Sequence, residues 1–559
     1  MNSSSTQGIC SILLKKGLFF LILVSSAAHT EANSPFIELM RARIEQIHSS
    51  GTGNVGGRQI IAIDLIANIY ARNSFRRLWG QPHDVKQLMA LIQTAADEGL
   101  NPEDYLFSFL TARLATDTGS SIDEVSRDLL LSDVFLRLAY HYYYGKTNPK
   151  KLYRGWNFSQ IQHSIDPVSL LLQATQDSNI KQSLLHLLPA ISHYAALRKG
   201  LKQYRNIEFN GGWAAVPPGP LLKKGMTNER IPWLQSRLRA SGDLALGTPV
   251  RRDAFTSEVE QALIRFQQRH GLKPDGIAGP DTISAMNVPI ANRIEQLRAN
   301  MERLRWVSQH LPQNYLLVDI VGFRVKQFLH GKENWSTRSQ VGTPYRETPV
   351  FRSVMTYLVL NPGWTVPPTI LKEDLLPKLR QDSSLLKKKR ISVIDQSGHE
   401  IDPASIDWSS VTLKNFNYNL RQRPGSNNAL GRIKFMFPNN YSVYLHDTPS
   451  KNLFEASQRA FSSGCIRIED PLELAELLLQ SNDGWNRKRL EQEIATGQTR
   501  TVKLNQPIPV LLMYFTAEAR EDSVILFRKD LYHRDASIVD ALNQPLSNNA
   551  VIDMPVWYQ

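Results

Sequence analysis

Cysteine is almost absent from this sequence of 559 residues, which contains only Cys10 and Cys465. Cys10 lies in an N-terminal stretch with the features of a secretory signal, so cleavage would leave a single thiol. Exported proteins generally pair their cysteines in disulfides or lack them. A disulfide within the mature chain is therefore excluded, and the remaining cysteine is buried, accidental or a nucleophile.

Long hydrophobic runs are also lacking. The N-terminal run Leu18–Val24 is shorter than the roughly 20 residues that span a bilayer, and no later segment approaches that length. Lys15 and Lys16 precede this run, and small residues follow it. We therefore expect residues 1–32 to be a signal peptide that directs export, and no membrane span after cleavage. An uncleaved membrane anchor is the alternative.

Acidic residues are too few to balance the basic ones. The formal net charge is +13, of which Lys15 and Lys16 account for two. Such an exported chain could meet nucleic acid, anionic lipid or an anionic wall polymer. No nucleic-acid motif accompanies the charge, so nucleic acid is not an expected partner. We interpret the one dense cluster, Lys387–Arg390, as the solvated end of a helix.

The order of patterns along the chain predicts a multidomain α+β protein. Residues 33–215 have helical periodicity and predict a helical scaffold domain. After a linker rich in glycine and proline, residues 220–290 predict a module of three short helices. Residues 300–545 predict a β-rich domain with an insertion of mixed signals at 371–426, and residues 546–559 form a tail.

One strand-like run of the β-rich domain ends at a histidine. Because side chains alternate along a strand, Ser442, Tyr444 and His446 are expected on one face. Tyr441 and the two apolar residues between them would then face the core. A lone histidine at a strand end is usually structural, but the loop that follows changes this interpretation.

That loop, Ser462–Arg467, contains Cys465. Gly464 can adopt backbone conformations that are closed to other residues, which lets a substrate approach closely. The N–H groups of Gly464 and Cys465 are candidates for an oxyanion hole. A nearby histidine and a helix opened by Pro471 could lower the pKa of the thiol. This chemistry needs no metal or organic cofactor, and none is expected. The residues alone indicate a cysteine acyl-transfer enzyme.

The module at 220–290 resembles a known wall-binding fold. Its stretches Ala262–Gln267, Gly271-Leu272 and Asp275–Thr282 resemble the three-helix peptidoglycan-binding module that is common in wall hydrolases. The resemblance implies that the module docks on wall glycan or stem peptide. A spacer that kept the fold and lost the affinity is the alternative.

The candidate nucleophile and base resemble a family signature. His446, fifteen intervening residues and Ser462–Arg467 resemble the signature of the L,D-transpeptidases, which crosslink peptidoglycan with a cysteine nucleophile. Ser463 stands where the family usually has histidine, and Arg467 stands where many members have asparagine. Both departures occur in the large periplasmic subgroup, which joins a helical scaffold, a wall-binding module and the catalytic domain. Because Ser463 is a poor base, His446 is the only nearby candidate.

Further stretches support this subgroup. Asn361–Pro368 resembles its Asn-Pro-x-Trp-x-Val-Pro element, and Leu430–Phe435 resembles the run that leads to the histidine. By resemblance, the insertion caps the active site, and its flanks Trp364 and Arg432 line the substrate channel. The other expected substrate-binding residues are Tyr444, Ser463 and Arg467.

The resemblance implies acyl transfer in two steps. Cys465 attacks the third residue of a tetrapeptide stem, by resemblance meso-diaminopimelate, and the terminal D-alanine leaves. The side-chain amine of a second stem then resolves the thioester into a 3→3 crosslink. The backbone carbonyl of Asp447 is expected to orient His446. The alternatives are an L,D-carboxypeptidase, with water as acceptor, and a non-catalytic peptidoglycan-binding protein on a decayed enzyme fold.

The same resemblance implies a role in cell-wall biogenesis and cell shape. The expected location is the periplasm, or the membrane surface if the signal stays uncleaved. Peptidoglycan stems are the expected partners as both donor and acceptor, and other wall synthases are further candidates. Carbapenems are expected to acylate Cys465.

Overall fold

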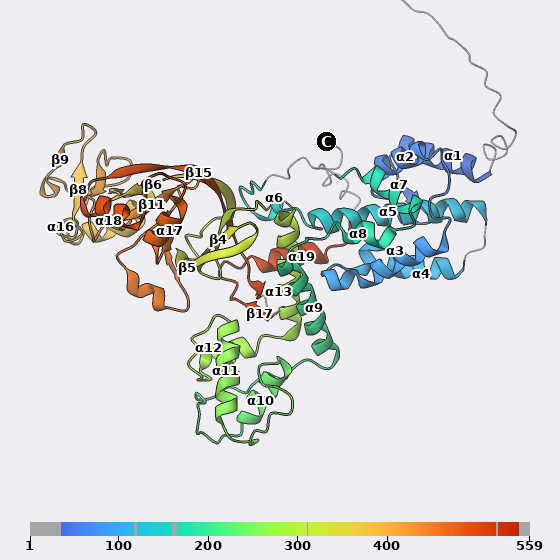
Figure 1. The fold of residues 1–559 in the computed structure, drawn as a ribbon, viewed down its shortest axis with the longest axis horizontal. Coiled ribbons are helices and arrows are strands. Elements are labelled where there is room, and N and C mark those ends of the chain that lie inside the picture. The colour runs from blue at the N-terminus through green and yellow to red at the C-terminus, as the bar shows by residue number, and fades with distance from the viewer. Residues whose placement is uncertain (1–34, 117–119, 159–164, 310, 521–523, 547–559) are drawn as a thin grey trace, which may run out of the picture.

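The structure is a computed structural model that describes residues 35–116, 120–158, 165–309, 311–520 and 524–546. The predicted signal peptide, 1–32, lies outside the described residues, as does most of the predicted tail, 546–559. Figure 1 shows three arms, with helices at one end, the main sheet at the other, and a small helical module that projects from the middle. The arms meet around helices α9 (Ser192–Phe209) and α13 (Ile290–Ser308).

The scaffold arm is built around one buried helix, α5 (Ser121–Tyr144). Two acidic residues of this helix are buried and accept backbone hydrogen bonds from loops that precede other helices. Asp128 accepts from the N–H of Trp79 at 2.9 Å, and Asp133 accepts from the N–H of Ala62 at 2.9 Å. Buried carboxylates need such donors, so each one fixes a loop against α5. The surrounding elements are α1 (Pro35–Ser50), β1 (Asn54–Val55), β2 (Arg58–Gln59), α2 (Ile63–Arg72), α3 (Pro82–Thr94), η1 (Ala95–Glu98), η2 (Pro102–Tyr105), α4 (Phe107–Ala115), α6 (Pro149–Leu152), α7 (Pro167–Gln176) and α8 (Ile180–Leu185).

The projecting module has a core of its own. Helices α10 (Ile231–Ala240), α11 (Ser257–Arg269) and α12 (Pro280–Met286) enclose a separate cluster of buried apolar residues. Gly276 turns the chain with a φ of +69°, and its N–H donates to the side chain of Gln267 at 2.9 Å. The predicted three-helix module is confirmed.

The catalytic arm is a closed sheet. Its strands follow the order β5-β14-β12-β11-β6-β15-β3-β4, and β4 also pairs with β5, while β13 is attached outside β5. Closure pairs the edges that an open sheet would leave exposed. The strands are β3 (Tyr315–Asp319), β4 (Arg324–Leu329), β5 (Lys332–Gly342), β6 (Phe351–Leu360), β11 (Ile433–Met436), β12 (Leu445–His446), β13 (Ala460–Ser462), β14 (Ile466–Ile468) and β15 (Arg500–Met513). The further elements of this arm are η5 (Lys451–Glu455), α17 (Pro471–Leu478), α18 (Arg487–Ala495), the hairpin β16 (Ala517–Ala519) and β17 (Ile525–Phe527), and α19 (Asp535–Asn543).

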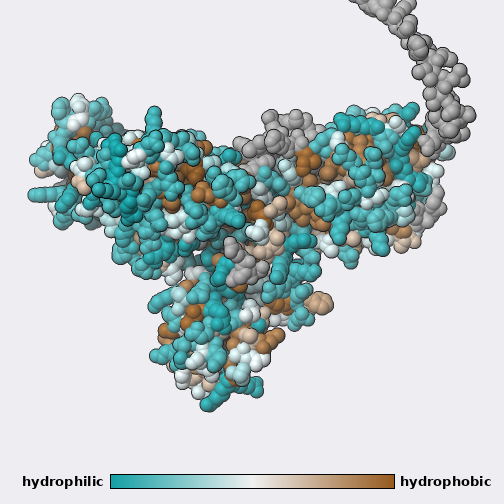
Figure 2. Space-filling model, viewed as in Figure 1, coloured by the Kyte–Doolittle hydropathy of each residue, from teal (hydrophilic) through white to brown (hydrophobic). Residues whose placement is uncertain are grey.

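The predicted insertion forms a cap at the far end of this arm (Figure 1). It has its own four-stranded sheet, in the order β7-β10-β8-β9, and its own apolar core. In the view of Figure 2, hydrophilic residues cover most of the cap, and hydrophobic residues are more frequent on the scaffold arm. The cap comprises β7 (Trp364–Thr365), α14 (Pro368–Ile370), η3 (Leu371–Leu375), α15 (Leu376–Leu379), α16 (Leu385–Lys388), β8 (Ile391–Ile394), β9 (Glu400–Ile401), η4 (Pro403–Ser405) and β10 (Asn419–Gln422).

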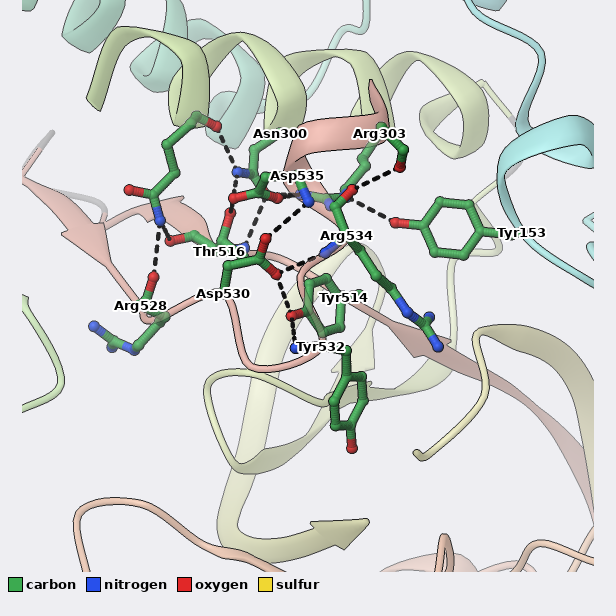
Figure 3. Close-up of polar contacts among 12 residues, drawn as sticks. Tyr153, Asn300, Arg303, Tyr514, Thr516, Arg528, Asp530, Tyr532, Arg534 and Asp535 are labelled. Atoms are coloured by element: carbon green, nitrogen blue, oxygen red, sulfur yellow. Dashed lines mark hydrogen bonds and ion pairs between the residues drawn. The ribbon is translucent and has the colours of Figure 1, made fainter. Parts of the chain in front are cut away.

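The scaffold and the barrel share one continuous hydrophobic core, which runs from Phe36 in α1 to Leu542 in α19. A polar network crosses the same junction (Figure 3). Arg303 of α13 pairs with Asp535 of α19 at 2.6 Å, and the Asn300 side chain donates to Thr516 Oγ1 at 2.7 Å. The two arms are therefore one packed body, although the sequence pattern separates them.

One expected strand is shorter than predicted. β12 comprises only Leu445–His446, because Ser442 has a φ of +56° and interrupts the extended chain. Tyr441, which was expected in the core, is 36% exposed. Its hydroxyl donates to the carbonyls of Arg154 and Gly155, so that it joins the barrel to the scaffold.

Among the described residues, no helix is both long enough and apolar enough to cross a bilayer.

Candidate active site

Two adjacent parallel strands bring the predicted nucleophile and base to one region. β12 pairs with β14, with Leu445 opposite Ile466 and His446 opposite Arg467. The N–H of Ile466 also donates to the carbonyl of Tyr444 at 3.1 Å, which places Cys465 beside Tyr444. Strand pairing thus unites residues that are nineteen positions apart in the sequence.

The loop that carries Cys465 is held by hydrogen bonds on both sides. Gly464 has a φ of +108°, a conformation that side chains disfavour. Its carbonyl accepts from Thr348 Oγ1 at 2.8 Å, and its N–H donates to Ser462 Oγ at 3.2 Å. The N–H of Cys465 has no hydrogen-bond partner among the described residues. Of the two N–H groups predicted as oxyanion donors, that of Cys465 is therefore free, whereas that of Gly464 is already hydrogen-bonded to Ser462.

Burial raises the pKa of the Cys465 thiol above its usual value. Hydrogen bonds with Tyr444 and the positive charges of Lys434 and Arg467 oppose this shift. The expected lowering by a helix was wrong, because strand β14 separates Cys465 from α17 (Pro471–Leu478). The thiol contacts the carbonyl of Ser442, with 3.7 Å between Sγ and oxygen. The site therefore holds a neutral thiol with cations positioned to stabilise its thiolate.

His446 is buried in the orientation that the sequence suggested. Its Nδ1 lies 2.5 Å from the backbone carbonyl of Asp447, so Nδ1 carries the proton, and the imidazole also interacts with the backbone of Leu430. Burial, followed by the charges of Arg467 and Lys434, lowers the pKa of His446 to about 3. The imidazole is therefore neutral at physiological pH. No hydrogen bond joins His446 to Cys465, and catalytic contacts of this kind often tighten only in the complex with substrate.

Lys434 is a site residue that sequence reasoning missed. It lies opposite His446 in the antiparallel pair of β11 and β12, and its Nζ is 3.8 Å from the centre of the Tyr444 ring. Burial lowers the pKa of Lys434, and the charge of a Cys465 thiolate raises it. A lysine in the middle of the apolar run Ile433–Met436 was the signal in the sequence.

The predicted substrate-binding residues fall into two groups. Tyr444 is half-buried with its ring centre 5.6 Å from that of His446, and Trp364 and Arg467 line a common cavity. Ser463 Oγ accepts from the Arg346 guanidinium at 2.9 Å, and Arg432 contributes its backbone N–H to the Asp447 carboxylate at 2.8 Å. Tyr444 and Arg467 therefore lie beside His446, whereas Trp364 lines a cavity that neither Cys465 nor His446 lines. The contacts of Ser463 and Arg432 give these two residues supporting positions.

The cavity of about 510 Å³ lies where the cap meets the barrel. The barrel contributes Thr448–Ser450, which follow His446, and Arg467, while the cap contributes Trp364 and several basic side chains. Among these are Lys388, Lys389 and Arg390. The cluster does lie at the end of helix α16, as predicted, but it also lines this cavity.

In the part of the chain that the structure describes, no group of three His, Cys, Asp or Glu side chains could hold a metal ion.

Three segments match known domain families. Residues 313–508 match the L,D-transpeptidase catalytic domain, residues 227–286 match a domain described as "Putative peptidoglycan binding domain", and residues 64–201 match a scaffold domain. Each segment lies within the corresponding predicted range, and the limits themselves stay predictions. The barrel thus matches the L,D-transpeptidase catalytic domain, and the projecting module matches a domain described as putatively peptidoglycan-binding.

Individual relatives agree with these matches. A "Putative L,D-transpeptidase" from Haemophilus influenzae is 36% identical over 248 residues, which cover 44% of this chain and 50% of that protein. A "Probable N-acetylmuramoyl-L-alanine amidase" from Bacillus licheniformis is 35% identical over 74 residues, which cover 13% of this chain and 21% of that protein. The chain thus spans half or less of the length of these relatives.

Among solved structures, the L,D-transpeptidase from Mycobacterium smegmatis aligns with a TM-score of 0.17 and 12% identity. The alignment covers 36% of this chain and 58% of that one.

Proposed function

We propose that this protein is a cysteine-dependent L,D-transpeptidase that forms 3→3 crosslinks between peptidoglycan stems. One observation carries the proposal. In a barrel that matches this catalytic domain, the buried, neutral His446 lies in β12, and Cys465 directly precedes β14, the strand that pairs with β12. Cys465 is also the only cysteine among the described residues.

The first step is acylation of Cys465. His446 accepts the thiol proton at Nε2, because Nδ1 is bonded to the Asp447 carbonyl. The thiolate attacks the carbonyl of the third stem residue, and Lys434 and Arg467 stabilise its negative charge. The free N–H of Cys465 is a donor for the tetrahedral oxyanion. Collapse of that intermediate breaks the bond to D-alanine, whose nitrogen takes the proton from His446.

The second step releases the thioester to an amine. The side-chain amine of a second stem attacks the acyl carbon, His446 takes the amine proton, and the sulfur leaves as the thiolate. Water in place of the amine would give the L,D-carboxypeptidase reaction. The cap beside the site supports the amine as acceptor, since closing an active site excludes water.

The further expectations from the sequence stay proposals. The peptidoglycan-binding domain supports wall stems as the partner. Export to the periplasm and a role in cell shape rest on the apolar run Leu18–Val24 and on the family alone. Deleting the module should weaken co-sedimentation with wall sacculi while carbapenem acylation continues.

Cys465→Ser is the decisive test. The purified variant and the wild type are each incubated with wall sacculi, which are digested and analysed for crosslinks by mass spectrometry. We expect 3→3 crosslinks from the wild type only, because a hydroxyl is far less acidic than a thiol. A carbapenem should add one covalent mass to the wild type and none to Cys465→Ala. Substantial crosslinking by Cys465→Ser would overturn the proposal.

A further inference from the structure

The cavity between the cap and the barrel is strongly basic. Five cationic side chains line it, namely Lys378, Lys388, Lys389, Arg390 and Arg467, and Asp374 is the one carboxylate among the lining residues. That carboxylate is already paired with Arg346 at 2.6 Å. A cavity with one sign of charge concentrates ligands of the opposite charge.

Most of these cations lack a protein partner. Lys388 pairs with Asp382 at 2.9 Å, whereas Lys378, Lys389 and Arg390 form no ion pair with any described carboxylate within 4.0 Å. Arg467 donates only to Gln340, at 3.3 Å, and its Nε is buried without a hydrogen-bond acceptor. A buried guanidinium nitrogen without an acceptor is costly, so the site is short of negative charge and of acceptors.

The backbone of the basic cluster Lys387–Arg390 is also fixed by hydrogen bonds within the cap. The Gln422 side chain in β10 donates to the Lys389 carbonyl at 2.8 Å and to the Asn427 carbonyl at 3.1 Å. Arg390 follows with a φ of +53°, a conformation that non-glycine residues adopt rarely. The side chains of Lys389 and Arg390 are thus attached to a fixed backbone beside the cavity.

The position of the cavity favours one of the two substrates. Its barrel residues are Thr448–Ser450, which begin two residues after His446, and Arg467, which lies opposite His446 in β14; neither His446 nor the nucleophile loop Ser462–Cys465 lines it. The incoming amine of the second step must give its proton to His446. A stem bound on the His446 side would bring that amine to the acyl carbon while the donor stem occupies the cysteine side.

We propose that this cavity binds the acceptor stem of peptidoglycan through its free carboxylates, with Lys378, Lys389, Arg390 and Arg467 as the recognition groups. The inference rests on the proposed function and names the substrate class of its second step. Carboxylates match these groups because guanidinium and ammonium donors form charge-assisted hydrogen bonds with them.

The test is a triple variant, Lys378→Gln/Lys389→Gln/Arg390→Gln, in the full chain. Lys387→Gln is the matched control, because this exposed lysine belongs to the same basic run and does not line the cavity. The acyl-enzyme is supplied with a soluble tetrapeptide donor, and the crosslinked product is measured against acceptor concentration. We expect the triple variant to raise the acceptor KM roughly tenfold, the size of one partly exposed charge-assisted contact. Carbapenem acylation should be unchanged.

A second acceptor separates charge recognition from a general defect. With an acceptor stem whose carboxylates are converted to amides, the wild type and the triple variant should have similar KM values, because neither then has a carboxylate to recognise. An equal KM for the wild type and the triple variant, or an equal loss in Lys387→Gln, would overturn the inference. A parallel loss of carbapenem acylation would also overturn it, because the cluster would then serve the donor or the fold.

Binding without catalysis keeps this inference separate from the proposed function. Calorimetric titration of Cys465→Ala with the free stem should show weaker binding when the triple change is added. If the wild type forms crosslinks and this titration shows no difference, only the cavity assignment fails. If the wild type forms neither thioester nor crosslink, the proposed function fails, and the inference about its second step fails with it.

Discussion

The barrel has two neighbours, and it is joined to them in opposite ways. The scaffold shares a continuous hydrophobic core with it, and the Arg303–Asp535 pair at this junction has side chains only 1% and 15% exposed. The cap has a separate core, and Arg346 ties it to the barrel through Glu373 and Asp374, which are 47% and 41% exposed. Buried core contacts give cooperativity, while exposed ion pairs give little. The comparison indicates one region that folds with the barrel and one that can move on it.

The largest effect should come from removing each region whole. A chain that begins at residue 311 lacks the scaffold and α13, which carry one side of the shared core and of the Arg303–Asp535 pair, and we expect no cooperative melting transition. Replacing residues 371–426 with a short Gly-Ser linker should leave a cooperative transition, because the cap core is separate. Differential scanning calorimetry of both proteins tests this contrast. Cooperative melting of the truncated chain would show that the barrel does not need the scaffold to fold.

The cap-less protein also tests the role of the cap in the reaction. If the cap excludes water, its removal should raise the ratio of hydrolysed tetrapeptide to 3→3 crosslink. Carbapenem acylation should change less than crosslinking. The product ratio is measured by chromatography, and an unchanged ratio at full crosslinking would leave the cap without this role.

Single substitutions at the two junctions should show the same contrast in stability. Arg303→Met leaves Asp535 without its partner, and we expect a loss of about 3–5 kcal/mol in the free energy of unfolding. Arg346→Met is its counterpart at the cap and should cost about 1 kcal/mol or less, because its carboxylate partners are half exposed. Chemical denaturation measures both values, and equal losses would contradict the contrast.

The scaffold junction should also position the nucleophile loop. The Tyr532 hydroxyl donates to the Gly342 carbonyl at 2.7 Å and accepts from the N–H of Thr348, whose side chain holds Gly464. Tyr532→Phe should therefore slow carbapenem acylation roughly tenfold at saturation, since about one hydrogen bond of positioning is lost. The concentration for half-maximal rate should stay unchanged.

Tyr514→Phe is the control for Tyr532→Phe, because Tyr514 contacts the same network through Asp530 and the Tyr532 N–H (Figure 3). It should lower stability and spare the acylation rate. A similar loss of rate in both variants would mean that Tyr532 acts only through the fold.

The burial of His446 should also set a pH dependence. The folded pKa of His446, about 3, lies below its unfolded value, so the unfolded state binds more protons between about pH 3 and 6.5. The contribution of this histidine to stability is thus present above pH 6.5 and is lost as pH falls toward 3. His446→Gln should flatten this part of the melting temperature profile.

For activity, the same shift predicts that carbapenem acylation by the wild type is independent of pH between about 5 and 8. A rate that follows a group with a pKa near 6.5 would show that His446 titrates normally. His446→Ala should lower the rate by about 10²–10⁴ at every pH in this range.

The sequence by itself determined the module, the helical scaffold, the β-rich domain and the loop that carries Cys465. These features depend on local periodicity, on glycine and proline, and on a motif within a few residues, all of which a sequence displays. His446 and Cys465 were found together because one motif contains both. The interruption at Ser442 was missed, because its positive φ depends on neighbours far away in the chain.

Only the tertiary structure decided which parts act together. The shared core of scaffold and barrel, the place of Lys434 opposite His446, and the cavity that gathers Lys378, Lys389 and Arg467 all join residues distant in sequence. Tertiary burial also reversed the expected shift in the thiol pKa, because desolvation outweighs the nearby cations. Burial and strand pairing are properties of the packed chain, and no local pattern specifies them.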